Sequence, residues 1–406
     1  MKKKLNIYVN IPENNGVGYY RLYSPWSEVK RQRLANVRIS DYGWGIRDTK
    51  SLFQRMEEWL IRTHSIPLNL LEELKKEIDW ADVVITGRKD TDEYCVLIKS
   101  IAQEFGKPVI VDSDDNVWAV RPYNAGYLSY NPNNQKILDN AKFIAQIATS
   151  MTVSTDELKR VYSQYCEDIM VLPNSVDFKW WKGIKQPKKD KIILGFEGSL
   201  AHYEDLLVLE DVIPKILKKY PDVEFHYFGD YPIWDTCEPS IKRRIKPVRK
   251  IFKGMIKISD LSEWPKNFAK ANFDICLAPL ADNLFNRAKS NLRFLEHSTL
   301  GIPTIASNVT PYKCIKHGID GYIAKDTDEW IKYISELIEN KKKRIEIGKN
   351  SFKRIQKEYN MEKNIKLWVR FAEDTYKKFN QSWDDHIKKM NQISKRSTTI
   401  VKKTNK

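Results

Sequence analysis

The 406-residue sequence contains no apolar run that approaches the roughly 18 residues needed to span a bilayer. Its first residues, MKKKLNIYVNI, have the basic start of a signal peptide, but the apolar part is short and is interrupted by Asn6 and Asn10. No small-residue cleavage site follows it. We therefore expect a first β-strand rather than an exported or membrane-spanning segment.

Cysteine is sparse. The five cysteines are far apart, with no C-x-x-C pair and no paired histidines. This pattern argues against a disulfide framework or a zinc site and is typical of a reducing cytosol. We expect a cytoplasmic protein, with peripheral contact at the inner membrane face as an open alternative.

Acidic residues are missing from two segments. Lys242–Lys257 holds eight basic residues and no acid, and Ile387–Lys406 holds seven and no acid, so together they carry fifteen of the sixteen excess positive charges. Such segments are often solvated lysine-rich surface or a disordered tail. The alternative is an anionic partner, such as nucleic acid, a lipid headgroup or a charged glycan.

Short apolar strands alternate with helical segments along most of the chain, which predicts parallel α/β sheets in two halves. The predicted strands of the first half cover residues 5–11, 36–40, 82–87, 108–111, 151–154 and 169–172. Those of the second half begin at residue 192 and continue at 223–229, 256–258, 275–280, 302–307 and 319–324. Between the halves, the basic segment Trp180–Lys191 is interpreted as a linker. From Met361 to about Lys389 the pattern predicts one long amphipathic helix whose inner side carries Leu367, Trp368, Phe371, Tyr376 and Phe379.

The stretch from Phe273 to Asn308 concentrates polar residues at one end of a strand–loop–helix–strand unit. A helix is predicted from about Asn291, with Ser290 as its cap, and Gly301 and Pro303 end it. Ligands bind to such sheets where loops leave the carboxyl ends of strands. A ligand site is therefore expected in this polar loop.

Three motifs resemble glycosyltransferases of the GT-B fold, in particular glycosyltransferase family 4 and its relatives. Val171–Asp177 (VLPNSVD) resembles the segment that ends their first domain, and Gly195–Ser199 (GFEGS) resembles the start of their nucleotide-sugar domain. Ser290–Pro303 resembles their "S-x-L-K-x-L-E-x-x-x-x-G-x-P" signature, with Arg293 in place of lysine.

The resemblance implies an α/β GT-B architecture, in which two Rossmann-like parallel-sheet domains face a central cleft and a C-terminal helix crosses back. The expected parts are an acceptor domain (1–178), a donor domain (190–360), a helix that packs back on the N-terminal domain (361–389) and a basic, disordered tail (390–406). The implied reaction moves a sugar from a nucleoside diphosphate sugar to an acceptor with retention of configuration, hexosyl transfer being the expected type. No metal or other cofactor is obligatory.

Within the donor domain, backbone N–H groups of Gly198 and Ser199 can hold phosphate at a strand-to-helix turn. Lys289 and Arg293 are the candidate cations for the diphosphate, although Arg293 could instead pair with Glu296 along the helix. The resemblance implies that Glu296 hydrogen-bonds to the ribose hydroxyls of the donor, and we count Glu296 among the catalytic candidates. The other predicted donor contacts are His202, Asn286, Ser290 and Asn291.

Two departures from the family pattern concern the sugar. Eight positions before Glu296, where the family carries a second glutamate, this chain has Ala288. After Gly198 the sequence continues Ser199-Leu200-Ala201-His202, without the usual lysine.

The first domain offers two further candidate sites. Asp112-Ser113-Asp114-Asp115 follows a buried strand and admits a D-x-D metal site, a general base for the acceptor, or loop hydrogen bonds; Asp114 and Asp115 are the catalytic candidates. The loop with Gly16, Gly18, Tyr19 and Arg21 follows the first strand and is a candidate substrate contact.

The acceptor is open between a glycan, a lipid-linked saccharide, a protein and nucleic acid. If the Lys242–Lys257 segment and the tail hold DNA, the protein is a DNA-modifying glycosyltransferase, and if they hold an anionic membrane surface, it is a peripheral membrane protein. A third alternative is a non-catalytic binding protein that kept the fold, which the alanine at position 288 suggests.

Overall fold

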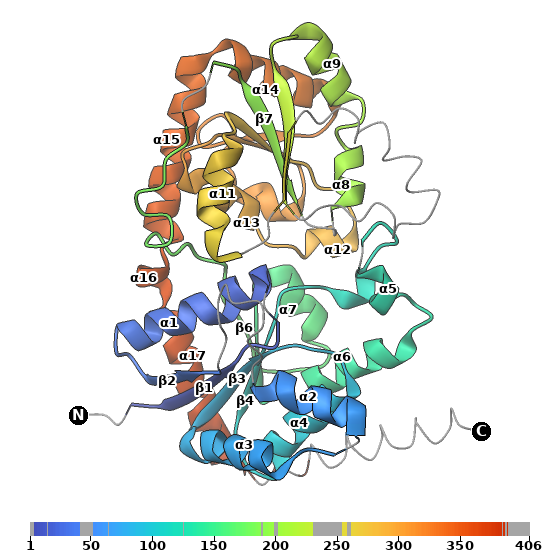
Figure 1. Ribbon diagram of the computed structural model, residues 1–406, viewed down its shortest axis with the longest axis vertical. Helices are drawn as coiled ribbons and strands as arrows, with labels where there is room; N and C mark the ends of the chain where they lie inside the picture. Colours follow the sequence, from blue (N-terminus) through green and yellow to red (C-terminus); the bar gives the residue numbers. More distant parts are fainter. Residues whose placement is uncertain are drawn as a thin grey trace. The chain divides into compact units, whose positions relative to one another are not determined.

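The computed structural model describes residues 4–13, 15–40, 52–63, 65–124, 126–187, 190–198, 202–229, 254–257 and 261–383, together with 385 and 388. These residues form two compact units (Figure 1). Unit 1 comprises Met1–Val117, Pro132–Pro173 and Glu362–Lys406, and unit 2 comprises Trp118–Asn131 and Asn174–Met361.

Unit 1 is built on a six-stranded parallel sheet in the order β2-β1-β3-β4-β5-β6. Buried apolar runs such as Val83–Gly87 form its strands, as expected of strands covered on both faces. The strands are β1 (Asn6–Asn10), β2 (Asn36–Ile39), β3 (Val83–Gly87), β4 (Val109–Ser113), β5 (Ser150–Val153) and β6 (Ile169–Val171).

Helices cover this sheet on both sides, and α1 contacts α17 while α4 contacts α2 and α6 (Figure 1). Thr91 begins α4 by accepting a hydrogen bond from Tyr94 N, as an N-cap residue does. The helices are α1 (Ser24–Arg31), α2 (Leu52–Thr63), α3 (Leu68–Trp80), α4 (Asp92–Gln103), α6 (Gln135–Ile147), α7 (Asp156–Tyr162) and α17 (Lys366–Gln381), preceded in the chain by the π-helical turn η1 (Gly18–Tyr23).

Unit 2 carries the second six-stranded parallel sheet, in the order β12-β11-β10-β7-β8-β9. Its strands are β7 (Ile193–Gly198), β8 (Glu224–Gly229), β9 (Gly254–Lys257), β10 (Ile275–Ala278), β11 (Thr304–Ser307) and β12 (Tyr322–Ala324). Apolar clusters lie on both sides of this sheet, around Trp330 on one and Phe268 on the other.

The helices of unit 2 pack pairwise, α14 with α9 and α13 with α15 (Figure 1). At the second contact a Cβ on Gly348 would lie 1.8 Å from Gly301 O, so only glycine allows this approach. The helices are α5 (Tyr127–Tyr130), α8 (Tyr203–Leu207), α9 (Val212–Lys219), α11 (Trp264–Ala271), α12 (Leu284–Arg287), α13 (Leu292–Thr299), α14 (Thr327–Glu339) and α15 (Lys341–Glu358), with 3₁₀ turns η2 (Val117–Ala119), η3 (Leu261–Glu263) and η4 (Thr310–Cys314).

Several local expectations were wrong. The helix after Ser290 begins at Leu292, and its N-cap is Asn291 without a side-chain bond, because Ser290 Oγ accepts instead from Asn174 Nδ2 at 2.9 Å. Trp181, assigned to a linker, packs on Phe268 inside unit 2. Residues 118–131, expected in the first domain, belong to unit 2.

The C-terminal helix is less regular than predicted over the residues that the structure describes. It divides into α16 (Met361–Asn364) and α17 (Lys366–Gln381). Trp368, Phe371 and Phe379 are buried as expected, but Leu367 is 46% exposed. Within unit 1, α17 is bound to the sheet and its loops by a hydrogen bond from Thr375 to Ser150 (3.0 Å) and an ion pair from Lys378 to Asp168 (2.8 Å).

Candidate functional site

The sheet order of unit 2 creates a switch point between β7 and β10. From β7 the chain proceeds to β8 and β9 on one side, then returns to β10 on the other. Crossovers that leave neighbouring strands in opposite directions open a crevice at the carboxyl ends of those strands, where ligands bind in such folds. Glu197 and Gly198 end β7, and Pro279 follows β10, so these residues flank the crevice.

Arg293 is the buried cation at this place. Its side chain reaches from α13 to donate from Nη1 to Pro279 O at 3.2 Å, and its guanidinium lies 5.1 Å from the centre of the Phe196 ring. Arg293 is only 8% exposed, and its Nη2 makes no hydrogen bond of good geometry to the described residues, although the guanidinium also interacts with the hydroxyl of Tyr312. A buried, unpaired donor next to Gly198 is suited to receive an anion.

His202 and Lys289 interact electrostatically in the same region as Arg293. Burial lowers the pKa of His202 to about 4. The positive charges of Arg293 and Lys289 lower this pKa further. His202 Nδ1 hydrogen-bonds to Asp205 at 2.6 Å, and this bond opposes the shift. His202 is therefore a neutral imidazole at pH 7, and the cluster of Arg293, Lys289 and His202 keeps a net positive charge of its own.

Asp205 ties together the two loops that carry these groups. Besides His202, it accepts hydrogen bonds from Ala281 N and Asn286 Nδ2, both at 2.8 Å. Asn286 is buried and also donates to Ala281 O at 2.9 Å. The amide of Asn286 is thus engaged in holding the loop after β10, so we assign it to the support of the site rather than to ligand contact.

Two other loop residues also hold protein groups. Ser290 accepts from Asn174, as described above, and Asn291 Nδ2 lies 3.3 Å from Cys314 Sγ. Ala288 is buried, so no carboxylate faces the site from that position. The structure thus brings together His202, Lys289, Arg293 and Glu296 from the predicted set, while Asn286, Ser290 and Asn291 fix the loop that presents them. Ser199 lies outside the described residues.

The sequence reasoning missed Glu197. This residue ends a buried strand, is 3% exposed and faces Glu296, which is also buried. Burial raises the pKa of Glu197 to about 7, against the lowering effects of Arg293 and of a side-chain hydrogen bond with Glu296. His297 Nε2 lies 3.3 Å from Glu197 Oε1. A charged residue inside an otherwise apolar strand was the signal that could have identified it.

The Gly198 turn is held from a neighbouring strand. Tyr227 donates its hydroxyl to Gly198 O at 2.7 Å. Gly229 has φ of +150°, and a Cβ there would lie 1.9 Å from Gly198 O. The end of β7 is therefore fixed where its backbone can approach a ligand closely.

In unit 1, the side chain of Arg21 is buried and bonded to protein acceptors. It is fully buried, its Nε and Nη2 donate to the two oxygens of Asp112 at 3.1 and 2.8 Å, and its Nη1 donates to Leu172 O. The predicted role of Arg21 in direct substrate contact does not agree with this geometry, because its guanidinium is enclosed by protein acceptors. Asp112 also accepts from Thr152 Oγ1 at 2.6 Å, so it is occupied as well.

The other candidates of unit 1 lie around this ion pair. Burial raises the pKa of Asp114 to about 6, with Arg21 opposing the shift and Asp115 adding to it. Gly16 has open space around its Cα, whereas Gly18 and Tyr19 are buried at the start of η1. Among the described residues, no group of three or more His, Cys, Asp or Glu side chains is placed to hold a metal ion.

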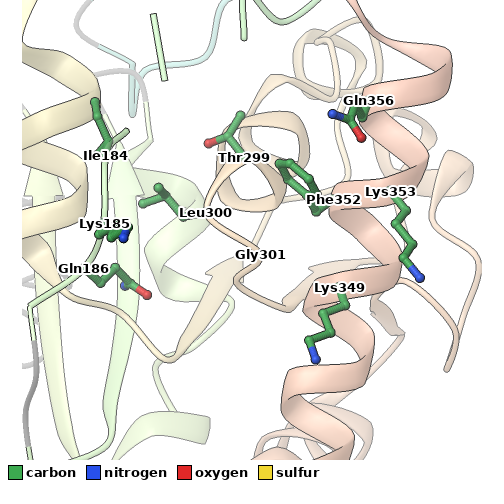
Figure 2. A pocket seen from close by; sticks show the side chains of 10 residues that line it. All are labelled: Ile184, Lys185, Gln186, Thr299, Leu300, Gly301, Lys349, Phe352, Lys353 and Gln356. Carbon is green, nitrogen blue, oxygen red and sulfur yellow. The ribbon is translucent and has the colours of Figure 1, made fainter. Parts of the chain in front are cut away.

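A cavity of about 610 Å³ in unit 2 lies away from these residues (Figure 2). It is bordered by Thr299–Gly301, which precede β11, and by α15 residues such as Lys349 and Phe352. These elements lie toward the amino ends of the strands. None of the predicted site residues lines the cavity, so we do not place the site there.

Two further expectations fall mostly outside the described residues. Of the basic segment Lys242–Lys257, the structure describes Gly254–Lys257 as β9, and of the tail only Lys388. None of the helices that the structure describes is long and apolar enough to cross a membrane.

Comparison with known proteins concerns the fold and the family of the chain. Residues 191–340, most of unit 2, match the model of the family described as Glycosyl transferases group 1. HepE from Anabaena, solved with UDP, has a TM-score of 0.60 at 14% identity, over 91% of this chain and all of that one. Sucrose-phosphate synthase from Thermosynechococcus elongatus has a TM-score of 0.59 at 14% identity, over 94% of this chain and all of that one. No curated protein sequence matches significantly.

The resemblance to GT-B glycosyltransferases and the fold of two Rossmann-like parallel-sheet domains are thereby confirmed. The match of residues 191–340 supports a glycosyltransferase. Membership in glycosyltransferase family 4 in particular stays a prediction.

Proposed function

We propose that this protein transfers a hexose from a nucleoside diphosphate sugar to an acceptor and that unit 2 holds the donor at the crevice between β7 and β10. The observation that carries the proposal is the buried guanidinium of Arg293, whose Nη2 makes no hydrogen bond of good geometry to the described residues and whose positive charge, with that of Lys289, lowers the pKa of His202. The match of residues 191–340 to a glycosyltransferase family supports it.

Each residue has a role that its surroundings allow. Arg293 and Lys289 neutralise the diphosphate, whose negative charge grows as it departs. Backbone groups at Gly198 approach the phosphates. Neutral His202 donates its single N–H, on Nδ1, to Asp205, so His202 holds the loop and does not donate to a phosphate. Glu296 accepts the ribose hydroxyls. Because Arg293 and Lys289 neutralise the diphosphate charge that a metal ion would otherwise neutralise, no metal is obligatory in this proposal.

UDP is the first nucleotide to test, because HepE, which shares the fold, has been solved with UDP and with UDP-glucose. The acceptor is proposed to bind unit 1 near Gly16 and Tyr19, with Asp114 or Asp115 as the base that receives the acceptor proton. A glycan, a lipid-linked saccharide or a protein fits this scheme. Neither the described residues nor the comparisons support contact with nucleic acid or a membrane, and most of the two basic segments lies outside the described residues. We propose retention of configuration, the outcome expected of family 4.

Calorimetry of nucleotide binding to the full chain tests the donor site. A screen of UDP, GDP and ADP and their sugars by thermal shift comes first, because a ligand at 100 times its Kd raises the unfolding free energy by about 2.7 kcal/mol. Glu296→Ala should then weaken the bound nucleotide at least tenfold, while Glu346→Ala, an exposed glutamate of α15, should leave affinity unchanged. Unchanged affinity in Glu296→Ala would remove this residue from the donor site.

Activity separates an enzyme from a binding protein with the same fold. Slow hydrolysis of the bound nucleotide sugar in the absence of acceptor, measured as release of nucleoside diphosphate, is expected of a transferase. Tight binding of every tested donor without any hydrolysis or transfer would favour the non-catalytic alternative.

A further inference from the structure

The cavity of about 610 Å³ in unit 2 is bordered by none of the residues assigned to the donor. Three segments surround it: Ile184–Gln186 on one side, α15 on the other, and Thr299–Gly301 between them (Figure 2). Small-molecule sites typically have volumes of about 300–1,000 Å³. The cavity is therefore large enough for a ligand of its own.

Every charged side chain that lines this cavity is positive. Lys185 comes from the first segment and Lys349 and Lys353 come from α15, while no aspartate or glutamate takes part in the lining. None of these three cavity lysines forms an ion pair with a residue that the structure describes. Lys349 and Lys353 are four positions apart, a spacing at which like charges on a helix repel each other. An anion bound in the cavity relieves this repulsion.

The arginines of the same helix, in contrast, are bound to protein groups. Arg354 pairs with Asp320 at 2.7 Å and with Glu358 at 3.0 Å. Arg344 donates from Nη1 to Leu337 O at 2.6 Å. These arginines hold α15 in the fold, and the cavity lysines are left available to a ligand.

Contacts within unit 2 fix the walls of the cavity. Gln186 donates from Nε2 to Phe273 O at 2.7 Å, which holds the first segment close to the start of β10. Phe352 packs edge-on against Phe178, with their ring centres 6.0 Å apart. The close glycine contact described above joins α15 to the end of α13. The cavity is thus preformed, as small-molecule sites usually are.

The lining favours a ligand that has an uncharged polar part as well as an anionic one. Ile184, Leu300 and Phe352 present apolar surface, against which the C–H face of a sugar ring can pack. The end of α13 at Thr299 carries the negative end of the helix dipole, which disfavours an anion on that side. Hydroxyl groups suit it instead, because the last carbonyls of a helix have no partner within the helix. Phosphate groups are favoured at the cavity lysines.

We propose that this cavity binds a phosphorylated sugar, with its phosphate groups on the cavity lysines and its ring against Leu300 and Phe352. No residue of the donor site takes part, so the ligand binds independently of the proposed function. A concave site with apolar walls favours a small molecule over nucleic acid or a membrane, whose phosphates lie along an extended surface.

Lysine labelling locates the site. The full chain is acetylated briefly with and without fructose 1,6-bisphosphate, and mass spectrometry measures the modification of each lysine. The three cavity lysines should be protected, because bound phosphate covers them and favours their protonated, unreactive form. Lys342 and Lys357, exposed residues of α15 outside the lining, should be labelled equally in both samples. The protection should persist with UDP present, since UDP is assigned to the other site.

Calorimetry measures the affinity of the same ligand. The double variant Lys349→Gln, Lys353→Gln should bind fructose 1,6-bisphosphate at least about tenfold more weakly than wild type, because hydrogen bonds to charged groups are lost. The matched control Lys342→Gln, Lys357→Gln removes the same charge from α15 and should bind as wild type. Glucose 6-phosphate should bind more tightly than inorganic phosphate, since its ring adds contacts with the apolar wall.

Three results would overturn the proposal. The first is that neither sugar phosphate binds, and the second is that the double variant binds as wild type, which would place binding in another basic part of the chain. The third is equal affinity for glucose 6-phosphate and inorganic phosphate, because the apolar wall would then contribute nothing. Protection of the cavity lysines by DNA or anionic vesicles alone would likewise exclude a sugar phosphate and indicate a larger partner. UDP binding at Arg293 is measured separately, so the two sites can fail independently.

Discussion

Replacement of Arg293 by methionine is the most informative single change in the donor site. Methionine keeps an apolar stem of similar reach next to Phe196 but removes the charge and every donor. The hydrogen bond to Pro279 O at 3.2 Å disappears, and so does the unpaired Nη2 that we assign to phosphate. Glu197 also loses the nearby positive charge that lowers its pKa.

The expected loss of UDP affinity follows from the bonds removed. A hydrogen bond to a charged group contributes about 1.5–3 kcal/mol, and the diphosphate gains at least one such bond from Nη2 in our account. At 1.4 kcal/mol per factor of ten, the Kd for UDP should rise about 10- to 150-fold. The folded state should persist, with an unchanged far-ultraviolet dichroism spectrum.

Arg287→Met is the matched control. Arg287 lies in the same loop region, six positions upstream, but is exposed and pairs with the exposed Asp282 at 2.6 Å. Such surface pairs contribute about 0–1 kcal/mol, so neither stability nor UDP affinity should change measurably. Calorimetry of both variants at pH 7 decides the matter. If Arg293→Met binds UDP within twofold of wild type, Arg293 does not contact the diphosphate and the donor site as described is wrong.

Three further predictions concern the framework of the two units. Gly348→Ala should destabilise unit 2 by about 3 kcal/mol, because its Cβ would collide with Gly301 O, and denaturant unfolding measures this. Asp112→Asn leaves buried Arg21 without its counter-ion and should cost about 3–5 kcal/mol in the same assay; a loss below about 1 kcal/mol would contradict the assigned ion pair. Asp114→Asn should match wild-type stability near pH 4 and exceed it above pH 6, because burial raises the folded-state pKa of Asp114, so that its stabilising effect is lost as pH rises through about 6; identical melting curves across this range would refute the raised pKa.

The parallel sheets were predictable because their strands carry local signals. Segments such as Val83–Gly87 and Ile275–Ala278 are continuous buried apolar runs, which periodicity identifies without any tertiary information. The helix of Gln135–Ile147 was not predicted, although its buried side includes Ala141 and Ile144. Small or scattered apolar residues give a weaker periodic signal.

The supporting contacts of the site could not be predicted, since each joins residues far apart in the sequence. Serine often caps helices, but Ser290 instead accepts a hydrogen bond from Asn174, 116 positions away. The position of Arg21 after a glycine-containing loop suggested a side chain free to contact a ligand. In the structure it pairs with Asp112, 91 positions downstream. Propensity cannot anticipate such pairs, because tertiary hydrogen bonds override local preferences.

The donor residues themselves were partly accessible from sequence. Arg293 and Glu296 stand in a motif with fixed spacing, and the structure places both in the interior beside the end of β7. Glu197 was overlooked because its strand was interpreted only as apolar core. A buried charge in such a strand is costly unless it has partners, and this cost is itself a signal of function.

A crystal structure of the full chain with UDP is the most direct test of the central claim, that the nucleotide binds at the switch point of unit 2. We predict that the diphosphate lies within hydrogen-bonding distance of Arg293 Nη2, with Lys289 beside it and the ribose against Glu296. UDP bound elsewhere, for example in the lysine-bordered cavity between Thr299–Gly301 and α15 (Figure 2), would contradict the account.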